Sequence, residues 1–139
     1  GTLAATDEII ASDKMAQFGS VGAVITLDRA FLEYYAENFL SFYGEDAPNK
    51  NAEWRAALAG DFGPIQEAAN RATKQFQEQV SKQRPISGGE AYQRTTLSGA
   101  MFDAVEARRR GLIDGIGTMN YALSRAGAWM QKGKKKKAA

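Results

Sequence analysis

The sequence contains no cysteine and no histidine among its 139 residues. The absence of cysteine excludes disulfides and cysteine nucleophiles, and the absence of both residue types excludes zinc sites of the Cys/His kind. Without histidine there is also no Ser-His-Asp triad. For hydrolytic chemistry this leaves serine or threonine with a lysine or carboxylate base, a pair of carboxylates, or a metal held by carboxylates. No cofactor-binding fingerprint is found, so we expect no cofactor.

Basic charge is scarce outside the C-terminus, although the net charge of the chain is +2. Five of the 18 basic residues are lysines within residues 132–139 (KGKKKKAA). The other 13 basic residues are outnumbered by the 16 acidic residues of the chain. We therefore expect a mildly acidic domain over residues 1–131 and a lysine-rich, disordered tail over residues 132–139. This pattern does not favour a nucleic-acid-binding surface on the domain, and binding of nucleic acid or an anionic surface remains a hypothesis for the tail alone.

Long apolar runs are also missing, since the longest covers only residues 21–27. This run is far shorter than the roughly 20 residues of a membrane-spanning helix. No basic segment followed by an apolar stretch opens the chain, as a secretory signal would. We expect a soluble protein, cytoplasmic or associated with a phage.

The pattern of apolar residues predicts a mixed α/β fold. Strands are expected at residues 7–12, 19–27 and 38–43, with the second one buried on both faces. Asp28 is expected to cap a helix, and a long amphipathic helix is expected over residues 64–84. Further expectations are a loop at residues 44–51, a short strand or turn at 97–102, and helices at 104–110 and from about 119 to 129.

Three stretches resemble one family of peptidases. Residues 5–12 (ATDEIIAS) with 18–24 (FGSVGAV) resemble its "A-x-D-x-I-x-A … G-S-[IV]-G-V" segment. Phe76, Val80 and Arg84 match "F-x-x-x-V-x-x-x-R", and residues 97–117 (LSGAMFDAVEARRRGLIDGIG) resemble its "G-L-[IV]-D" region. In this order and spacing they resemble the C-terminal part of the signal peptide peptidase A, protease IV and phage capsid-maturation serine peptidases. The loop at residues 47–51 is most similar to the phage or prophage members.

The resemblance implies a Clp-protease/crotonase-like α/β fold of stacked β-β-α units, assembled into homo-oligomers. It also implies hydrolysis of peptide bonds in a polypeptide substrate by a Ser–Lys dyad. Lys50 occupies the place of the family's lysine, the general base, and Ser20 that of a serine which orients the lysine amine. The family's nucleophilic serine lies about ten residues before "D-x-I", and residues 1–6 contain no serine. We therefore expect the nucleophile in a missing N-terminal portion of the same peptidase and no activity from this chain alone.

Other hypotheses stay open beside this one. The chain could serve oligomerisation, or act as a non-catalytic assembly or capsid scaffold-associated protein, because residues 31–43 are rich in aromatic side chains that a partial domain leaves exposed. For Lys50, we expect Phe42, Tyr43 and Trp54 to supply apolar walls that favour the neutral amine. We expect the acidic residues Asp103, Glu106 and Asp114 to be helical surface charge, and residues 108–110 to be a solvated helix end.

Overall fold

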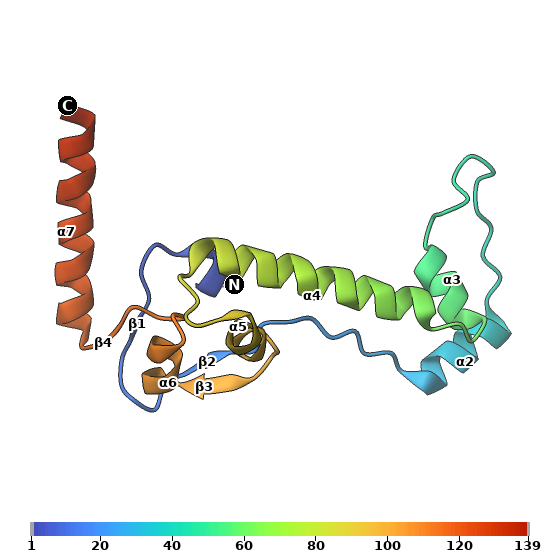
Figure 1. The fold of residues 1–139 in the computed structure, drawn as a ribbon. Coiled ribbons are helices and arrows are strands. Elements are labelled where there is room, and N and C mark those ends of the chain that lie inside the picture. The colour runs from blue at the N-terminus through green and yellow to red at the C-terminus, as the bar shows by residue number, and fades with distance from the viewer. Residues whose placement is uncertain (1, 139) are drawn as a thin grey trace. The chain divides into compact units, whose positions relative to one another are not determined.

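A computed structural model describes residues 2–138, and the chain divides into two compact units. Unit 1 consists of residues 1–21 and 77–139, and unit 2 consists of residues 22–76. Helices and short strands occur together in the chain (Figure 1), so the predicted mixed α/β class is confirmed. Each unit is described below by itself.

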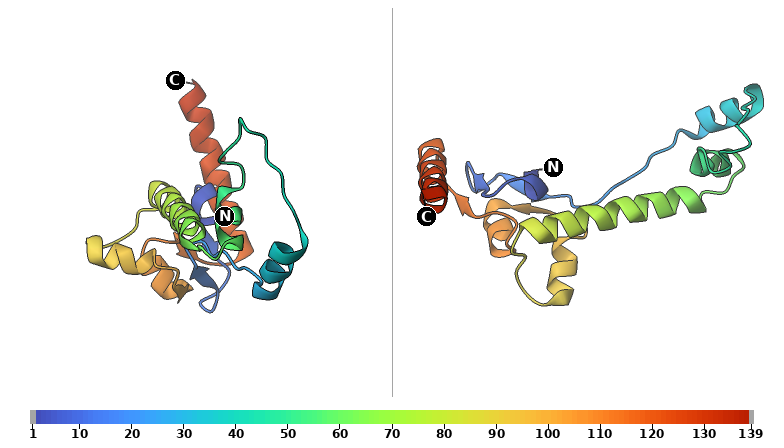
Figure 2. Two further views of the ribbon diagram at one scale, coloured as in Figure 1. Left: turned by 90° about the vertical axis from the view of Figure 1, so that its right-hand side faces the viewer. Right: turned by 90° about the horizontal axis from the view of Figure 1, so that it is seen from above.

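Unit 1 contains two small sheets. Strand β1 (Ile10–Ala11) pairs in parallel with β4 (Gly115–Ile116), and β2 (Gln17–Gly19) pairs antiparallel with β3 (Met101–Asp103). The prediction of a strand within residues 7–12 is confirmed in its last part. Figure 2 shows β2 and β3 side by side.

Four helices complete unit 1 together with the C-terminal part of a fifth. They are α1 (Thr2–Ala5), α5 (Glu90–Thr96), α6 (Ala104–Arg109), α7 (Met119–Ala138) and the end of α4 (Gly63–Gln83). The predicted helices at 64–84 and 104–110 are confirmed within one residue at each end. The core of unit 1 is apolar and comprises Ile9, Ala11, Val21, Val80, Ala104, Ala107, Leu112 and Ile113, all buried.

Helix α7 is longer than predicted and includes residues 132–138 of the segment expected to be a disordered tail. Alanine and lysine have high helix propensity, so a lysine-rich composition does not by itself stop a helix. Within unit 1, Glu8 binds α7 by accepting from Nε of Arg125 and from Nε1 of Trp129, both at 2.7 Å. The hydrogen bond from Arg125 is the main reason why the pKa of Glu8 is lowered.

Unit 2 begins with an extended segment, residues 22–28, that forms no strand. The prediction of a buried strand here is wrong, since Val24 is 86% exposed. After it come α2 (Arg29–Asn38), α3 (Ala52–Leu58) and the first part of α4. Asp28 caps α2 by accepting from the main-chain N–H of Phe31, as predicted. Residues 39–43 are not a strand either, whereas the predicted loop at 44–51 is confirmed.

Candidate functional site

Ser20 lies directly after β2 in a loop with unusual backbone geometry. Its φ is +53°, and the preceding Gly19 has φ +136°. A side chain at Gly19 would place Cβ only 2.1 Å from the carbonyl oxygen of Ala100, and the N–H of Ser20 donates to the same oxygen at 3.0 Å. The loop is thus held against the residues that precede β3. The Ser20 side chain is exposed and has no hydrogen-bond partner among residues 2–138, so its hydroxyl is available.

Lys50 lies in the turn before α3. Its N–H donates to the carbonyl of Ala47 at 3.1 Å, and Asn51 follows with φ +52°. Arg55 donates to the carbonyl of Pro48 and thereby ties the loop to α3. The Lys50 side chain is exposed and forms no ion pair within the described part of the chain. The turn therefore presents a free amine.

The apolar side chains that were expected to surround the Lys50 amine make other contacts or face solvent. Phe42 is 91% exposed, and Tyr43 lies under the guanidinium of Arg55, 4.7 Å from ring centre to Cζ. Trp54 packs against Phe31 and Tyr35. Because these rings pair among themselves or face solvent, unit 2 alone does not build an apolar pocket for the amine. Ser20 belongs to unit 1 and Lys50 to unit 2, so each is described in its own unit.

Asp114 joins the three stretches that carry the family resemblance. One of its carboxylate oxygens, Oδ2, accepts from the main-chain N–H of Ile9 at 2.8 Å and from Nη2 of Arg84 at 2.5 Å. The Arg84 side chain is 1% exposed and that of Asp114 32% exposed. Ile9 comes from the first stretch, Arg84 from the second and Asp114 from the third. Sequence reasoning interpreted Asp114 as surface charge and missed this role.

Helix α6 carries a second polar cluster in unit 1. Asp103 caps the helix, and Glu106 accepts from Nε of Arg109 at 2.8 Å and from Nε of Arg110 at 2.6 Å. The bond from Arg109 is the largest cause that lowers the pKa of Glu106 to about 2. Arg110 lies 4.4 Å and 4.3 Å from the ring centres of Tyr92 and Phe102. The expectation of a solvated helix end is therefore wrong for Arg110, whose side chain is only 13% exposed.

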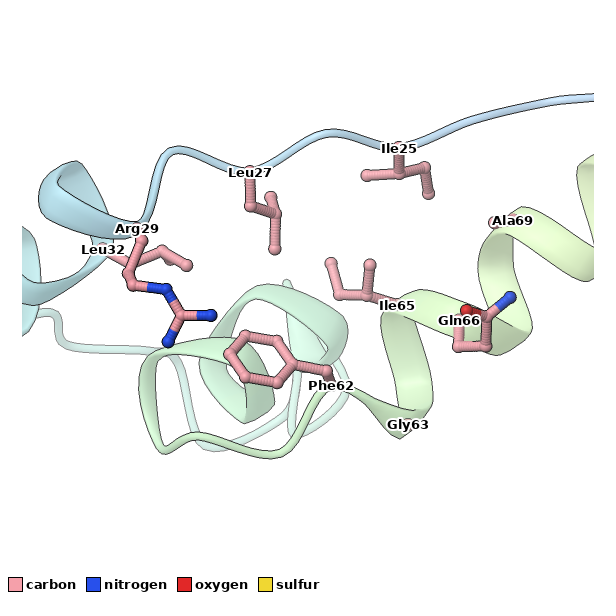
Figure 3. A pocket seen from close by; sticks show the side chains of 9 residues that line it. All are labelled: Ile25, Leu27, Arg29, Leu32, Phe62, Gly63, Ile65, Gln66 and Ala69. Atoms are coloured by element: carbon pink, nitrogen blue, oxygen red, sulfur yellow. The ribbon is translucent and has the colours of Figure 1, made fainter.

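Unit 2 contains a groove that the sequence did not indicate. Figure 3 shows side chains from the extended segment and from the start of α4 that face one another across it, and its volume is about 490 Å³. Arg29, the first residue of α2, supplies the charged group of the lining, and Gln66 supplies an amide. The apolar lining comes mainly from Ile25, Leu27, Leu32, Phe62 and Ile65. Concave apolar surfaces with few polar groups are typical of binding sites.

Comparison with known proteins adds no relative, since no protein-family model matches the sequence and no curated protein matches it. Among residues 2–138, no group of three or more acidic side chains is arranged to hold a metal ion. Within the same residues, no helix is both long enough and apolar enough to cross a membrane.

Proposed function

We propose that this chain is the C-terminal part of a serine peptidase that cleaves peptide bonds with a Ser–Lys dyad. Lys50 is the general base, and Ser20 orients its amine. Residues 1–6, which precede the family-like segment, contain no serine, so the proposal requires the nucleophile from another segment of polypeptide. That segment would also complete the stacked β-β-α units of a Clp-protease/crotonase-like fold around the two small sheets.

The observation that carries the proposal is the meeting of three distant stretches at Asp114. The family pattern is one of sequence alone, and nothing in it requires its parts to touch. The contacts of Asp114 with Ile9 and Arg84 give residues from all three parts a common structural role. Arg84 and Asp114 meet through their side chains, so they are expected to occur together in a sequence, and this supports the resemblance.

The chemistry of the dyad determines what the rest of the protein must supply. A lysine accepts a proton from a serine hydroxyl only as the neutral amine, which burial in apolar surroundings favours. Lys50 is exposed and free of ion pairs within the described residues. The segment that brings the nucleophile must therefore also cover Lys50 and exclude water from it. Ser20 suits the orienting role because a hydroxyl accepts a hydrogen bond from the amine while staying neutral.

The test requires a polypeptide in which the family's serine motif precedes these residues. Its hydrolysis of an unfolded protein and of fluorogenic peptides is compared with that of Lys50→Ala. The expected result is a loss of about 10²-fold or more in kcat/KM, the usual contribution of a general base. Lys74→Ala is the matched control, because Lys74 is another exposed lysine of unit 2 without an ion pair among residues 2–138. Equal activity of the two variants would contradict the role of Lys50.

A second candidate function is assembly without catalysis, and a specific observation favours it. Val24, Leu40 and Phe42 of unit 2 are 86%, 88% and 91% exposed, and exposed apolar side chains of this size promote association. The assembly hypothesis expects oligomers of the 139-residue chain by light scattering, and dissociation in a Leu40→Asp, Phe42→Asp variant. A monomer at high concentration would rule it out for this chain.

A further inference from the structure

The groove of unit 2 contains an unpaired cation within an otherwise mostly apolar lining. Arg29 forms no hydrogen bond through its side chain and no ion pair among the described residues. The neighbouring Asp28 uses Oδ1 to cap α2, 3.1 Å from the N–H of Phe31. Glu33, one turn further along α2, does not approach Arg29 within ion-pair distance. The guanidinium therefore remains available to an occupant.

Charge complementarity defines one end of that occupant. Burying an unpaired guanidinium beneath an apolar ligand costs free energy, whereas a carboxylate can pair with it through two parallel hydrogen bonds. In Figure 3 the Arg29 side chain extends toward Phe62, and Ile25, Leu27 and Ile65 face the groove beside it. The matching ligand thus has an apolar body and a carboxylate at one end.

The main chain beside the groove distinguishes a peptide from a fatty acid. Ile25 and Leu27 line the groove from alternate positions of an extended segment. Within the part of the chain that the structure describes, the N–H and C=O groups of residues 24–27 make no hydrogen bond. An extended peptide can pair with such an edge by adding a strand, and a fatty acid cannot.

We propose that this groove binds the carboxyl terminus of an extended polypeptide whose last residue is apolar. The terminal carboxylate pairs with Arg29, the last side chain lies among Leu27, Phe62 and Ile65, and the peptide main chain pairs with residues 24–27. This binding requires no hydrolysis, so the site stands independently of the Ser–Lys dyad. A binding measurement on the 139-residue chain tests this site alone, so a failure of the groove proposal can be distinguished from a failure of the peptidase proposal.

The test measures fluorescence anisotropy of a short labelled peptide of alternating threonine and valine that ends in leucine. The peptide is made as the free acid and as the carboxamide. A charge-assisted hydrogen bond predicts that the free acid binds about tenfold tighter or more. Arg29→Gln keeps a polar side chain but removes the charge, and it is expected to abolish the preference for the free acid. Phe62→Ala is expected to weaken binding of both peptides.

Arg71→Gln is the matched control, because Arg71 is an exposed arginine of the same unit that pairs with Glu53. It is expected to retain the preference for the free acid, and circular dichroism verifies that every variant keeps its helices. Equal binding of acid and amide, a preference that persists in Arg29→Gln, or no binding by the helical wild-type chain would overturn the proposal. Full displacement of the peptide by dodecanoate at equal concentration would also overturn it, by assigning the groove to a fatty acid.

Discussion

Arg84 and Asp114 form an ion pair of 2.5 Å in unit 1, although 30 positions separate them in the sequence. Arg84 directly follows the long helix α4 and is 3% exposed, and Asp114 directly precedes β4. The same carboxylate oxygen holds the N–H of Ile9, which precedes β1. One acidic side chain therefore fixes the end of a helix to the two strands of a parallel pair.

Replacing Asp114 by asparagine is expected to destabilise unit 1 by about 2 to 4 kcal/mol. Asparagine can still accept from Ile9, but the buried Arg84 loses its ion-pair partner and keeps only the longer-range attraction of Glu8, and removing one partner of a buried pair is costly. The Nε atom of Arg84 already lacks a hydrogen-bond partner among the described residues, so little else compensates its burial. Urea unfolding followed by circular dichroism measures the change.

The double variant Arg84→Met, Asp114→Asn distinguishes the stability contributed by the ion pair from the cost of leaving Arg84 unpaired. Removing both charges avoids the unpaired cation, so we expect the double variant to be more stable than Asp114→Asn alone. Arg71→Met is the control for an exposed pair, with an expected cost below about 1 kcal/mol. A double variant less stable than Asp114→Asn would show that Arg84 contributes through its packing.

The helices of this protein could be predicted from the sequence because their signals are local. Asp28 precedes apolar residues at helical spacing, and residues 64–84 carry one apolar stripe, so α2 and α4 were found. The seven-residue helices α3 and α5 are not predicted, although α6, with six residues, is. Strand predictions at 19–27 and 38–43 failed largely because β-propensity reflects packing against neighbouring strands. Only Gly19 of these segments pairs with a strand, and among residues 2–138 no strand pairs with residues 20–27 or 38–43.

The candidate site was predictable only where a motif existed. Only the resemblance indicates Ser20 and Lys50, because a serine or lysine in a loop is otherwise expected to be an ordinary surface residue. The role of Asp114 depends on contacts across 30 and 105 positions, which no local pattern carries. The groove beside Arg29 joins two segments about 35 residues apart and has no sequence signature at all.

Gly111 ends α6 in a conformation that only glycine adopts without strain. Its φ is +80°, its N–H and that of Leu112 close the helix onto Arg108 and Ala107, and an added Cβ would lie 2.1 Å from the carbonyl oxygen of Pro85. Gly111→Ala is therefore expected to destabilise unit 1 by more than the strain of a left-handed residue alone, which is about 1 to 2 kcal/mol. Urea unfolding is again the measurement.

Gly99→Ala provides the control for strain without a clash. Gly99 has φ +91°, but a Cβ there would meet only the carbonyl oxygen of Val21, at an ordinary contact distance of 3.9 Å. The expected cost is about 1 to 2 kcal/mol, at least about 1 kcal/mol less than for Gly111→Ala. Similar costs for both variants would mean that residues 85–86 move aside freely.

The ion pairs of Glu106 are expected to stabilise the folded chain at neutral pH and to lose this effect in acid. Its pKa is lowered from 4.5 to about 2 in the folded chain by Arg109 and Arg110, so the folded state holds the proton less tightly than the unfolded state. The stabilisation is fully present above pH 4.5 and is lost as the pH falls toward 2. Thermal unfolding across this range is expected to show Glu106→Gln less stable than wild type near neutral pH. The two melting temperatures should converge near pH 2, and a constant difference would contradict the assignment.

In the peptidase proposed above, variants of Ser20 distinguish a role of its hydroxyl from a role of its backbone. Ser20→Ala and Ser20→Gly both remove the hydroxyl, but only glycine relieves the left-handed backbone at φ +53°. If the hydroxyl orients the Lys50 amine, both variants lose activity to a similar extent, about 10- to 100-fold, as for other residues that position a reactive group. The acid limb of the pH profile of kcat/KM, which reports the base in the free enzyme, should shift in both.

A backbone role for Ser20 gives a different pattern. Alanine would then preserve activity and glycine alone would lower it, because only glycine loosens the loop that binds Ala100. Ser98→Ala is the matched control, since Ser98 is another exposed serine of unit 1 whose hydroxyl donates to the carbonyl of Thr95. Activity retained by Ser20→Ala to the level of Ser98→Ala would remove the hydroxyl from the mechanism and leave Lys50 to be oriented by the segment that carries the nucleophile.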